Sequence, residues 1–325
     1  MKVGIISFAH IHAFSYARAL QRLEDVELAG IADPDRVRGE AAARQFCVPF
    51  FSDIAGLLDS DIDAVIVTSE NVNHCEHVLA AAKAGKHVLC EKPLATTLKD
   101  AQEMIESCKK NGVGLMTAFP VRFNPSIARA REMVLKEGRL GRILAIKGTN
   151  RGKNPGGWFV DPLLSGGGAV MDHTVHVVDV MRWYMGSEVR EVYAEVDRLP
   201  SADGIDEAGI LTMEFDNGVF ATLDCSWSRN HAFPTWGDVT LEIVGTRGTL
   251  LVDAFAQKLH VYTDDQGVSW DYWGDDMDVG MIREFVTSIR EGRSPSVTGE
   301  DGLKAVEVAL AAYQAAETLT PVILR

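Results

Sequence analysis

The first 120 residues alternate short apolar runs with longer amphipathic segments. The apolar runs predict β-strands at residues 3–6, 26–32, 64–68, 87–90 and 114–117, and helical patterns fill the intervals between them. Strands that are apolar on both faces and joined by helices are typical of a parallel sheet covered on both sides. We therefore expect a doubly wound α/β domain over residues 1–120, with its ligands beyond the carboxyl ends of the strands.

The pattern changes after Pro120, where strands begin to follow one another without helices between them. A helix is predicted at 125–137 and a first strand at 142–149, and turn signals such as Asn217-Gly218 separate the later runs. The later strands are predicted at 189–196, 208–215, 219–226, 239–244, 248–252 and 258–263, and two helices at 278–291 and 301–318. Residues 121–325 thus predict a second domain with a mostly antiparallel, open-faced sheet and helices.

The charge balance bears on possible partners. Lysine and arginine number 32 against 46 aspartate and glutamate residues, which gives a net charge of -14. Nucleic-acid binding needs clustered basic residues, and the chain has no basic run. The acidic clusters at 264–265 and 275–278 are interpreted as solvated loops, and no metal is assigned to them.

Cysteine usage and the apolar runs bear on the compartment. The 5 cysteines form no C-x-x-C pair, and an odd number cannot close into a complete disulfide framework. The chain shows neither a secretory leader pattern nor an apolar run of about 20 residues. We expect a cytoplasmic protein in a reducing compartment, with no membrane partner.

The turn after the first predicted strand is where a dinucleotide-binding domain places a G-x-G-x-x-G motif. In this chain Ser7, Ala9 and His12 occupy the three glycine positions. Ser7 and Ala9 are small enough for a phosphate to approach closely, but His12 is bulky. The segment alone leaves nucleotide binding open.

The second predicted strand ends at Asp33. A carboxylate there can accept hydrogen bonds from both ribose hydroxyls of NAD and repel the 2′-phosphate of NADP. Two alternatives stay open: the segment Asp33-Pro34-Asp35 caps the next helix, or Arg36 and Arg38 accommodate NADP. NAD is favoured as the cofactor over NADP.

Further motifs make a resemblance specific. They are Asn-Val-Asn-His at 71–74, the segment around Glu-Lys-Pro at 84–94, Arg-Phe-Asn-Pro at 122–125, Gly-Arg-Leu-Gly-Arg at 138–142, and the Gly-rich segment from Ser165 through His176 to Trp183. In this order they resemble the glucose-fructose oxidoreductase, inositol dehydrogenase and rhizopine catabolism family, Gfo/Idh/MocA. Beyond about residue 200 the chain is compatible with the family in pattern rather than in motif. The resemblance implies a Rossmann-type first domain, NAD or NADP as cofactor, and an oxidoreductase that transfers a hydride between nicotinamide and a secondary alcohol of a sugar, inositol or related polyol.

Three residues suit that chemistry on their own. Lys92 follows a strand end and precedes Pro93, which favours an extended backbone in the expected crevice, where an ammonium can bind a substrate oxygen. Asp172 and His176 lie four apart on a predicted helix and therefore share a face, and an imidazole there can remove a hydroxyl proton. His173 lies about 100° around that helix and is interpreted as structural.

The resemblance also implies roles for named residues. The equivalents of Lys92, Asp172 and His176 surround the reacting carbon, with Asp172 orienting His176. The equivalents of Ser69, Asn71, His74 and Glu91 lie along the cofactor. From their positions after the predicted strands, further cofactor contacts are expected from Ser7, Ala9, His10, His12, Asp33 and Lys92. Substrate contacts are expected from Arg122, Trp158, His231 and Trp236.

Two other functions and an assembly are considered. His10-Ile11-His12 has the spacing of a zinc-binding pair in a metal-dependent hydrolase, with His74, Asp172 or His176 as further ligands. The missing glycines also fit a non-catalytic sugar or nucleotide sensor. Because an open sheet face is costly to leave in water, we expect a homodimer or homotetramer.

Overall fold

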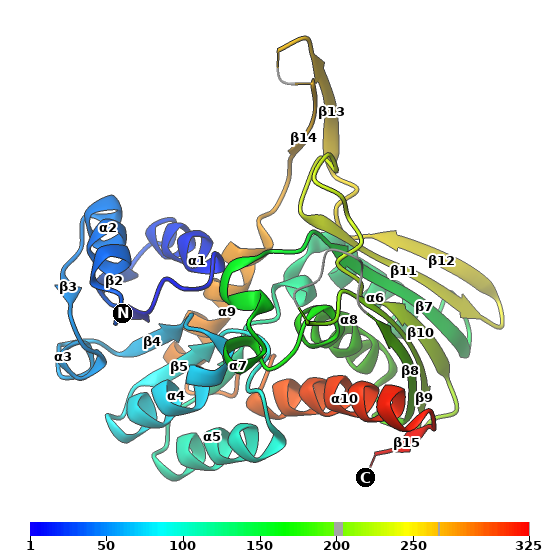
Figure 1. The fold of residues 1–325 in the computed structure, drawn as a ribbon, viewed down its shortest axis with the longest axis horizontal. Helices are drawn as coiled ribbons and strands as arrows, with labels where there is room; N and C mark the ends of the chain where they lie inside the picture. The colour runs from blue at the N-terminus through cyan, green and yellow to red at the C-terminus, as the bar shows by residue number, and fades with distance from the viewer. Residues whose placement is uncertain (198–203, 266, 325) are drawn as a thin grey trace. The chain divides into compact units, whose positions relative to one another are not determined.

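The computed structural model describes residues 1–197, 204–265 and 267–324, and it divides the chain into two compact units (Figure 1). The first unit contains Met1–Pro120, Leu163–Gly166 and Asp278–Leu303. The second contains Val121–Pro162, Gly167–Met277 and Lys304–Arg325. The predicted boundary at 120 coincides with a change of unit, but the sequence had placed all of 121–325 in the second domain.

The first unit is built on a six-stranded parallel sheet in the order β3-β2-β1-β4-β5-β6. Its strands are β1 (Lys2–Ile6), β2 (Glu27–Ala32), β3 (Phe50–Phe51), β4 (Ala64–Val67), β5 (His87–Cys90) and β6 (Leu115–Thr117). Its helices are α1 (His12–Gln21), α2 (Arg36–Phe46), α3 (Ile54–Leu58), α4 (His74–Lys83) and α5 (Leu98–Lys110). Strand order reverses between β1 and β4, and this is where such sheets bind ligands.

Helix α9 (Met277–Arg290) completes the first unit from the far end of the sequence. Its apolar face, which includes Met281, Ile282 and Phe285, is buried. Thr117 at the end of β6 donates a hydrogen bond to the Thr298 carbonyl. An amphipathic pattern shows which face of a helix is buried but not which compact unit covers it.

The second unit is built on a seven-stranded sheet in the order β12-β11-β7-β10-β9-β8-β15. Its strands are β7 (Ile143–Gly152), β8 (Val189–Asp197), β9 (Ala208–Phe215), β10 (Phe220–Asp224), β11 (Gly237–Gly245), β12 (Gly248–Asp253) and β15 (Val322–Ile323). The β7–β10 pair is parallel, whereas the other neighbours are antiparallel. The predicted mostly antiparallel sheet is confirmed.

Helices cover one face of this sheet, and the other face is open (Figure 1). They are α6 (Pro125–Leu135), α8 (Ala169–Met185) and the part of α10 (Gly299–Thr318) that belongs to the second unit. Buried and less buried positions alternate along β9 and β11, as a sheet covered on one side requires. Short helix α7 (Pro162–Ser165) precedes α8.

The predicted strand at 258–263 exists but was placed in the wrong sheet. It is β13 (Lys258–Thr263), and it pairs with β14 (Gly267–Tyr272) in a separate two-stranded hairpin (Figure 1). Alternating apolar residues indicate a strand, but they do not identify its partner. In the described part of the chain, no helix combines the length and hydropathy needed to cross a membrane.

Candidate functional site

Polar side chains gather at the carboxyl ends of the strands in the first unit. Ser7 follows β1, Asp33 follows β2, Ser69 follows β4 and Glu91 follows β5, and all four are buried. Parallel strands end at one edge of a sheet, so these groups lie along one line. Buried polar groups at this edge mark the candidate site.

In the loop after β1, which replaces the expected glycine-rich turn, the backbone amides donate hydrogen bonds to acceptors within the protein. Ser7 has a positive φ of 69°, and its hydroxyl accepts a hydrogen bond from the Ala9 amide at 3.1 Å. The Phe8 amide donates to Asp33 at 2.7 Å, and the His10 amide donates to the Thr68 carbonyl at 2.9 Å. These hydrogen bonds hold the loop in place, and they occupy amides that a glycine-rich turn would leave free to bind phosphate.

Asp33 is fully buried and hydrogen-bonded on both oxygens. It accepts from the Phe8 and Asp35 amides, and the Arg38 guanidinium donates to both of its oxygens at 2.8 Å. Asp35, rather than Asp33, caps α2 by accepting from the Arg38 amide at 3.0 Å. The interpretation of the segment as a helix cap thus holds for Asp35, while Asp33 forms a buried ion pair.

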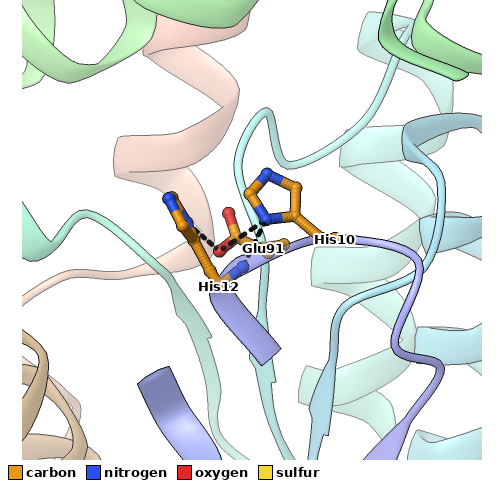
Figure 2. Close-up of side chains that lie close together, drawn as sticks. All are labelled: His10, His12 and Glu91. Carbon is orange, nitrogen blue, oxygen red and sulfur yellow. Dashed lines mark hydrogen bonds and ion pairs between the residues drawn. The ribbon is translucent and has the colours of Figure 1, made fainter. Parts of the chain in front are cut away.

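Glu91 is the centre of a second buried cluster. Its Oε1 lies 2.8 Å from His12 Nδ1 and accepts a hydrogen bond from the Tyr16 hydroxyl, and its Oε2 accepts from the Lys92 amide at 2.7 Å. Figure 2 shows the carboxylate between the rings of His10 and His12. Burial acts to raise the pKa of Glu91, but the neighbouring histidines and Lys92 hold it well below its usual range.

Lys92 itself is only 4% exposed, and its peptide bond to Pro93 is cis. A buried ammonium is costly unless an anion or several acceptors lie near it. The ionised Glu91 carboxylate supplies that charge at the preceding residue. The position suits a lysine that meets a ligand inside the site rather than one solvated on the surface.

The loop after β4 supplies three more predicted residues. Asn71 is buried, and its amide nitrogen donates to the Ser165 carbonyl at 2.8 Å. Ser69 is hydrogen-bonded to His77 Nδ1 at 2.9 Å. Both nitrogens of the buried His74 ring face carbonyl oxygens, at 2.9 Å to Pro93 and 3.2 Å to Ser69. His74 therefore joins the loops that follow β4 and β5.

In the second unit, Asp172 and His176 lie near the start of α8 and are both buried. Asp172 Oδ2 accepts a hydrogen bond from the Trp227 indole at 3.1 Å and lies 3.3 Å from His173 Nε2. His173 Nδ1 in turn faces the Cys225 carbonyl. His173 was interpreted as merely structural, but it contacts the carboxylate that carries a predicted catalytic role.

The start of α8 is held by residues that sequence reasoning missed. The Asp206 carboxylate accepts from the amides of Gly168 and Val170 at 2.9 and 2.8 Å, and the Tyr313 hydroxyl donates to it at 2.8 Å. A Cβ at Gly168 would collide with the Asp206 carbonyl oxygen. The glycines before α8 thus allow a remote carboxylate to cap the helix that carries Asp172 and His176.

The predicted substrate residues lie in different environments of the second unit. Arg122 is buried and forms a bidentate ion pair with Asp179. Trp158 stacks on Phe159, with their ring centroids 3.9 Å apart. Trp236 is partly exposed and packs edge-on against His173. His231 is exposed in a turn.

The donors and acceptors of the first unit fit a dinucleotide. In the described residues, the buried Asn71 Oδ1 has no hydrogen-bond partner, so it can accept from a ribose hydroxyl. His10, His12 and Glu91 also place possible metal-ligand atoms within 4.8 Å of one another. Hydrogen bonds with Tyr16 and with the His12 amide explain this cluster, and we assign no metal to it.

Comparisons with known proteins agree with this arrangement. Residues 1–119 match the "Oxidoreductase family, NAD-binding Rossmann fold" model, and residues 127–251 match the "GFO/IDH/MocA C-terminal domain" model. The chain is 31% identical to myo-inositol 2-dehydrogenase of Thermotoga maritima, over 98% of this chain and 96% of that protein. It is 32% identical to D-xylose 1-dehydrogenase (NADP(+)) 2 of Haloferax volcanii, over 98% of each chain.

A solved structure extends the likeness to the whole fold. A levoglucosan dehydrogenase in complex with NADH and levoglucosan superposes with a TM-score of 0.86 at 25% identity, covering 99% of each chain. These findings support neither the metal-dependent hydrolase nor the non-catalytic sensor. The chain belongs to the Gfo/Idh/MocA family of NAD-binding oxidoreductases.

Proposed function

We propose that this chain catalyses reversible hydride transfer between a nicotinamide dinucleotide and a secondary alcohol of a sugar, inositol or related polyol. The observation that carries the proposal is the buried Lys92 beside the ionised Glu91, at the carboxyl end of β5 in an NAD-binding domain. The relatives named above act on myo-inositol, D-xylose and levoglucosan, which are all polyhydroxylated rings or their derivatives.

When bound, the nicotinamide supplies or accepts the hydride. Lys92 is proposed to donate a hydrogen bond from Nζ to the reacting oxygen, which stabilises negative charge as it develops there. Glu91 fixes the Lys92 backbone by accepting a hydrogen bond from its amide. Asn71 Oδ1 is proposed to accept a hydrogen bond from a ribose hydroxyl.

His176 is proposed as the general base that takes the substrate hydroxyl proton on a ring nitrogen. Asp172 was expected to orient His176. The Asp172 carboxylate also contacts Trp227 and His173, which hold it in one orientation. We therefore add His173 and Trp227 as positioning residues for Asp172.

NAD is proposed as the preferred cofactor because Asp33 ends β2, where a carboxylate meets the adenosine ribose. Arg38 reduces the preference for NAD over NADP, because its partly exposed guanidinium neutralises the Asp33 carboxylate that would repel a 2′-phosphate. The binding ratio of NADH to NADPH measures the balance between the two.

A cytoplasmic location and a homodimer or homotetramer belong to the same proposal. Support for assembly comes from the open face of the second unit's sheet, where Ile210, Phe220 and Leu251 are exposed. Burial of such side chains between copies would remove apolar surface from water. Light scattering that shows a stable monomer at micromolar concentration would contradict it.

The function is tested by following NADH absorbance with a panel of polyols that includes myo-inositol and D-xylose. Lys92→Met should lower kcat by about 10²- to 10⁴-fold, as expected for the loss of a group that assists proton or charge movement. Lys99→Met is the matched control because Lys99 is exposed on α5. Failure of the wild-type protein to reduce or oxidise any polyol, with both NAD and NADP, would reject the proposal.

A further inference from the structure

His12 stands where the third glycine of the dinucleotide turn is expected, and it is the first residue of α1. Its side chain is 36% exposed, whereas the carboxylate that holds it is fully buried. The pyrophosphate of a dinucleotide lies at the amino end of this helix in dinucleotide-binding domains. A partly exposed imidazole therefore stands at the expected place of a dianionic group.

The backbone of this loop offers little to such a group. The amides of Ser7, Phe8, Ala9, His10 and His12 already donate to acceptors within the protein. Within the described residues 7–12, only the Ile11 amide has no acceptor. A turn that binds a diphosphate mainly through amides, as glycine-rich turns do, would need several of them free. Some other donor must supply the missing hydrogen bonds.

The orientation of His12 makes it that donor. Glu91 Oε1 lies 2.8 Å from Nδ1, so this ring nitrogen carries a proton toward the carboxylate. Nε2 is left as the nitrogen that can meet a ligand, in the way that a carboxylate fixes the free nitrogen of other functional histidines. Figure 2 shows the Glu91 carboxylate beside one edge of the His12 ring, with the second ring nitrogen directed away from it.

We propose that the imidazolium of His12 binds the diphosphate of the dinucleotide through Nε2, in place of the amides of a glycine turn. This inference rests on the proposed function, because it names a residue that binds the cofactor of that reaction. It selects between the two roles considered for His12, namely contact with cofactor and contact with substrate. The charge-assisted hydrogen bond would exist only while His12 is protonated.

The groups around His12 favour the charged form. Burial opposes it, but the Glu91 carboxylate and its hydrogen bond outweigh burial and raise the pKa of His12. Lys92 acts against the charge, and Asp278 at the start of α9 acts in its favour. The ring of His10 lies 4.2 Å away, and Tyr16 binds the same carboxylate oxygen. A bound diphosphate would add further negative charge.

The sign of the pH dependence follows from this assignment. Below its pKa His12 is protonated and binds the diphosphate, and above it the contact is lost. The affinity for NADH should therefore fall as pH rises, by at most about tenfold for each pH unit, because one proton is linked to binding. ADP-ribose, which carries the diphosphate but no nicotinamide, should follow the same curve.

The test measures equilibrium binding of NADH and ADP-ribose from about pH 6 to about pH 9, in a buffer free of phosphate. His12→Asn keeps an amide that can reach Glu91 but lacks an Nε2 atom, and His12→Gln replaces the ring with a neutral donor. At the acid end, His12→Asn should weaken both ligands by about 10- to 100-fold, the range for one hydrogen bond to a charged group. Both variants should lose the pH dependence.

Arg18→Gln is the matched control, because it removes an exposed positive charge from the same helix without reaching its amino end. It should change neither affinity by more than about twofold, since exposed charges are screened at this distance. Wild-type affinity that is independent of pH, or a pH dependence that survives in His12→Asn, would overturn the inference. So would a variant that weakens NADH but not ADP-ribose. If wild-type protein binds neither NADH nor NADPH, the proposed function itself fails.

Discussion

Asp206 provides the sharpest test of how α8 is held in place. Its two carboxylate oxygens accept hydrogen bonds from the amides of Gly168 and Val170, and its Oδ1 also accepts from Tyr313. Asp206→Asn keeps the shape of the side chain but replaces one oxygen with an NH₂ group. Whichever way the amide turns, one of the two backbone N–H groups then faces another donor.

The expected cost follows from these contacts. Losing one hydrogen bond to a charged group costs about 1.5–3 kcal/mol. Losing a negative charge at a helix amino end costs about 0.3–1 kcal/mol more. The free energy of unfolding of the second unit should therefore fall by about 2–4 kcal/mol.

The protein contains its own probe for this measurement. All six tryptophans, which lie at described positions, belong to the second unit. Urea unfolding followed by tryptophan fluorescence therefore reports the second unit, without the assumption that both units unfold together. Asp216→Asn makes the same chemical change at an exposed position and serves as the control.

The same variant should separate binding from catalysis. Its NADH affinity should stay within about twofold of the wild-type value, because the cofactor residues lie in the first unit. Its kcat should fall, since the start of α8 carries Asp172 and His176. A stability change below about 0.5 kcal/mol, as for a surface substitution, would refute the role of Asp206 as a cap.

Three further predictions concern buried charges. Arg122→Met should destabilise the second unit by about 3–5 kcal/mol because it leaves Asp179 buried without its partner, and Asp179→Leu in the same chain should restore most of the loss in urea unfolding. Arg38→Ala should expose the uncompensated Asp33 carboxylate and weaken NADPH more than NADH in paired titrations; an equal loss of both would argue against this. Because the folded pKa of Glu91 lies below its unfolded value of about 4.3, its ionised form stabilises the fold above that pH, and the stability is lost as pH falls through the folded pKa. Melting temperatures of Glu91→Gln should therefore vary less than wild-type values between neutral and acidic pH.

The local pattern of apolar and polar residues was sufficient to predict the parallel sheet and most strands of the second sheet. Short apolar runs such as the one in β4, bounded by turn signals and separated by helical patterns, are typical of a parallel sheet covered on both faces. The same patterns did not show that β13 leaves the main sheet or that α9 joins the first unit. Those outcomes depend on long-range contacts, which periodicity does not contain.

Some residues of the candidate site could be predicted from the sequence, and others could not. Motif and position along the chain indicated Lys92, Glu91 and Asp172, because each follows a strand or begins a helix. Trp227 and Asp206 were missed, since each acts on a partner that is distant in the sequence. Arg38 was considered only as a residue that could accommodate NADP, and asking what neutralises a buried carboxylate at Asp33 would have predicted its ion pair.

The placement of α9 also affects how the chain can fold during synthesis. The first 120 residues leave the ribosome early, but the apolar surface that Phe285 and Ile282 cover is completed only when residues 278–303 have been made. Until then the nascent sheet leaves that apolar surface uncovered, because the segment that covers it begins only at residue 278. A partly synthesised chain that ends between these two points therefore exposes apolar surface that the complete fold buries, which is a general cause of aggregation during folding.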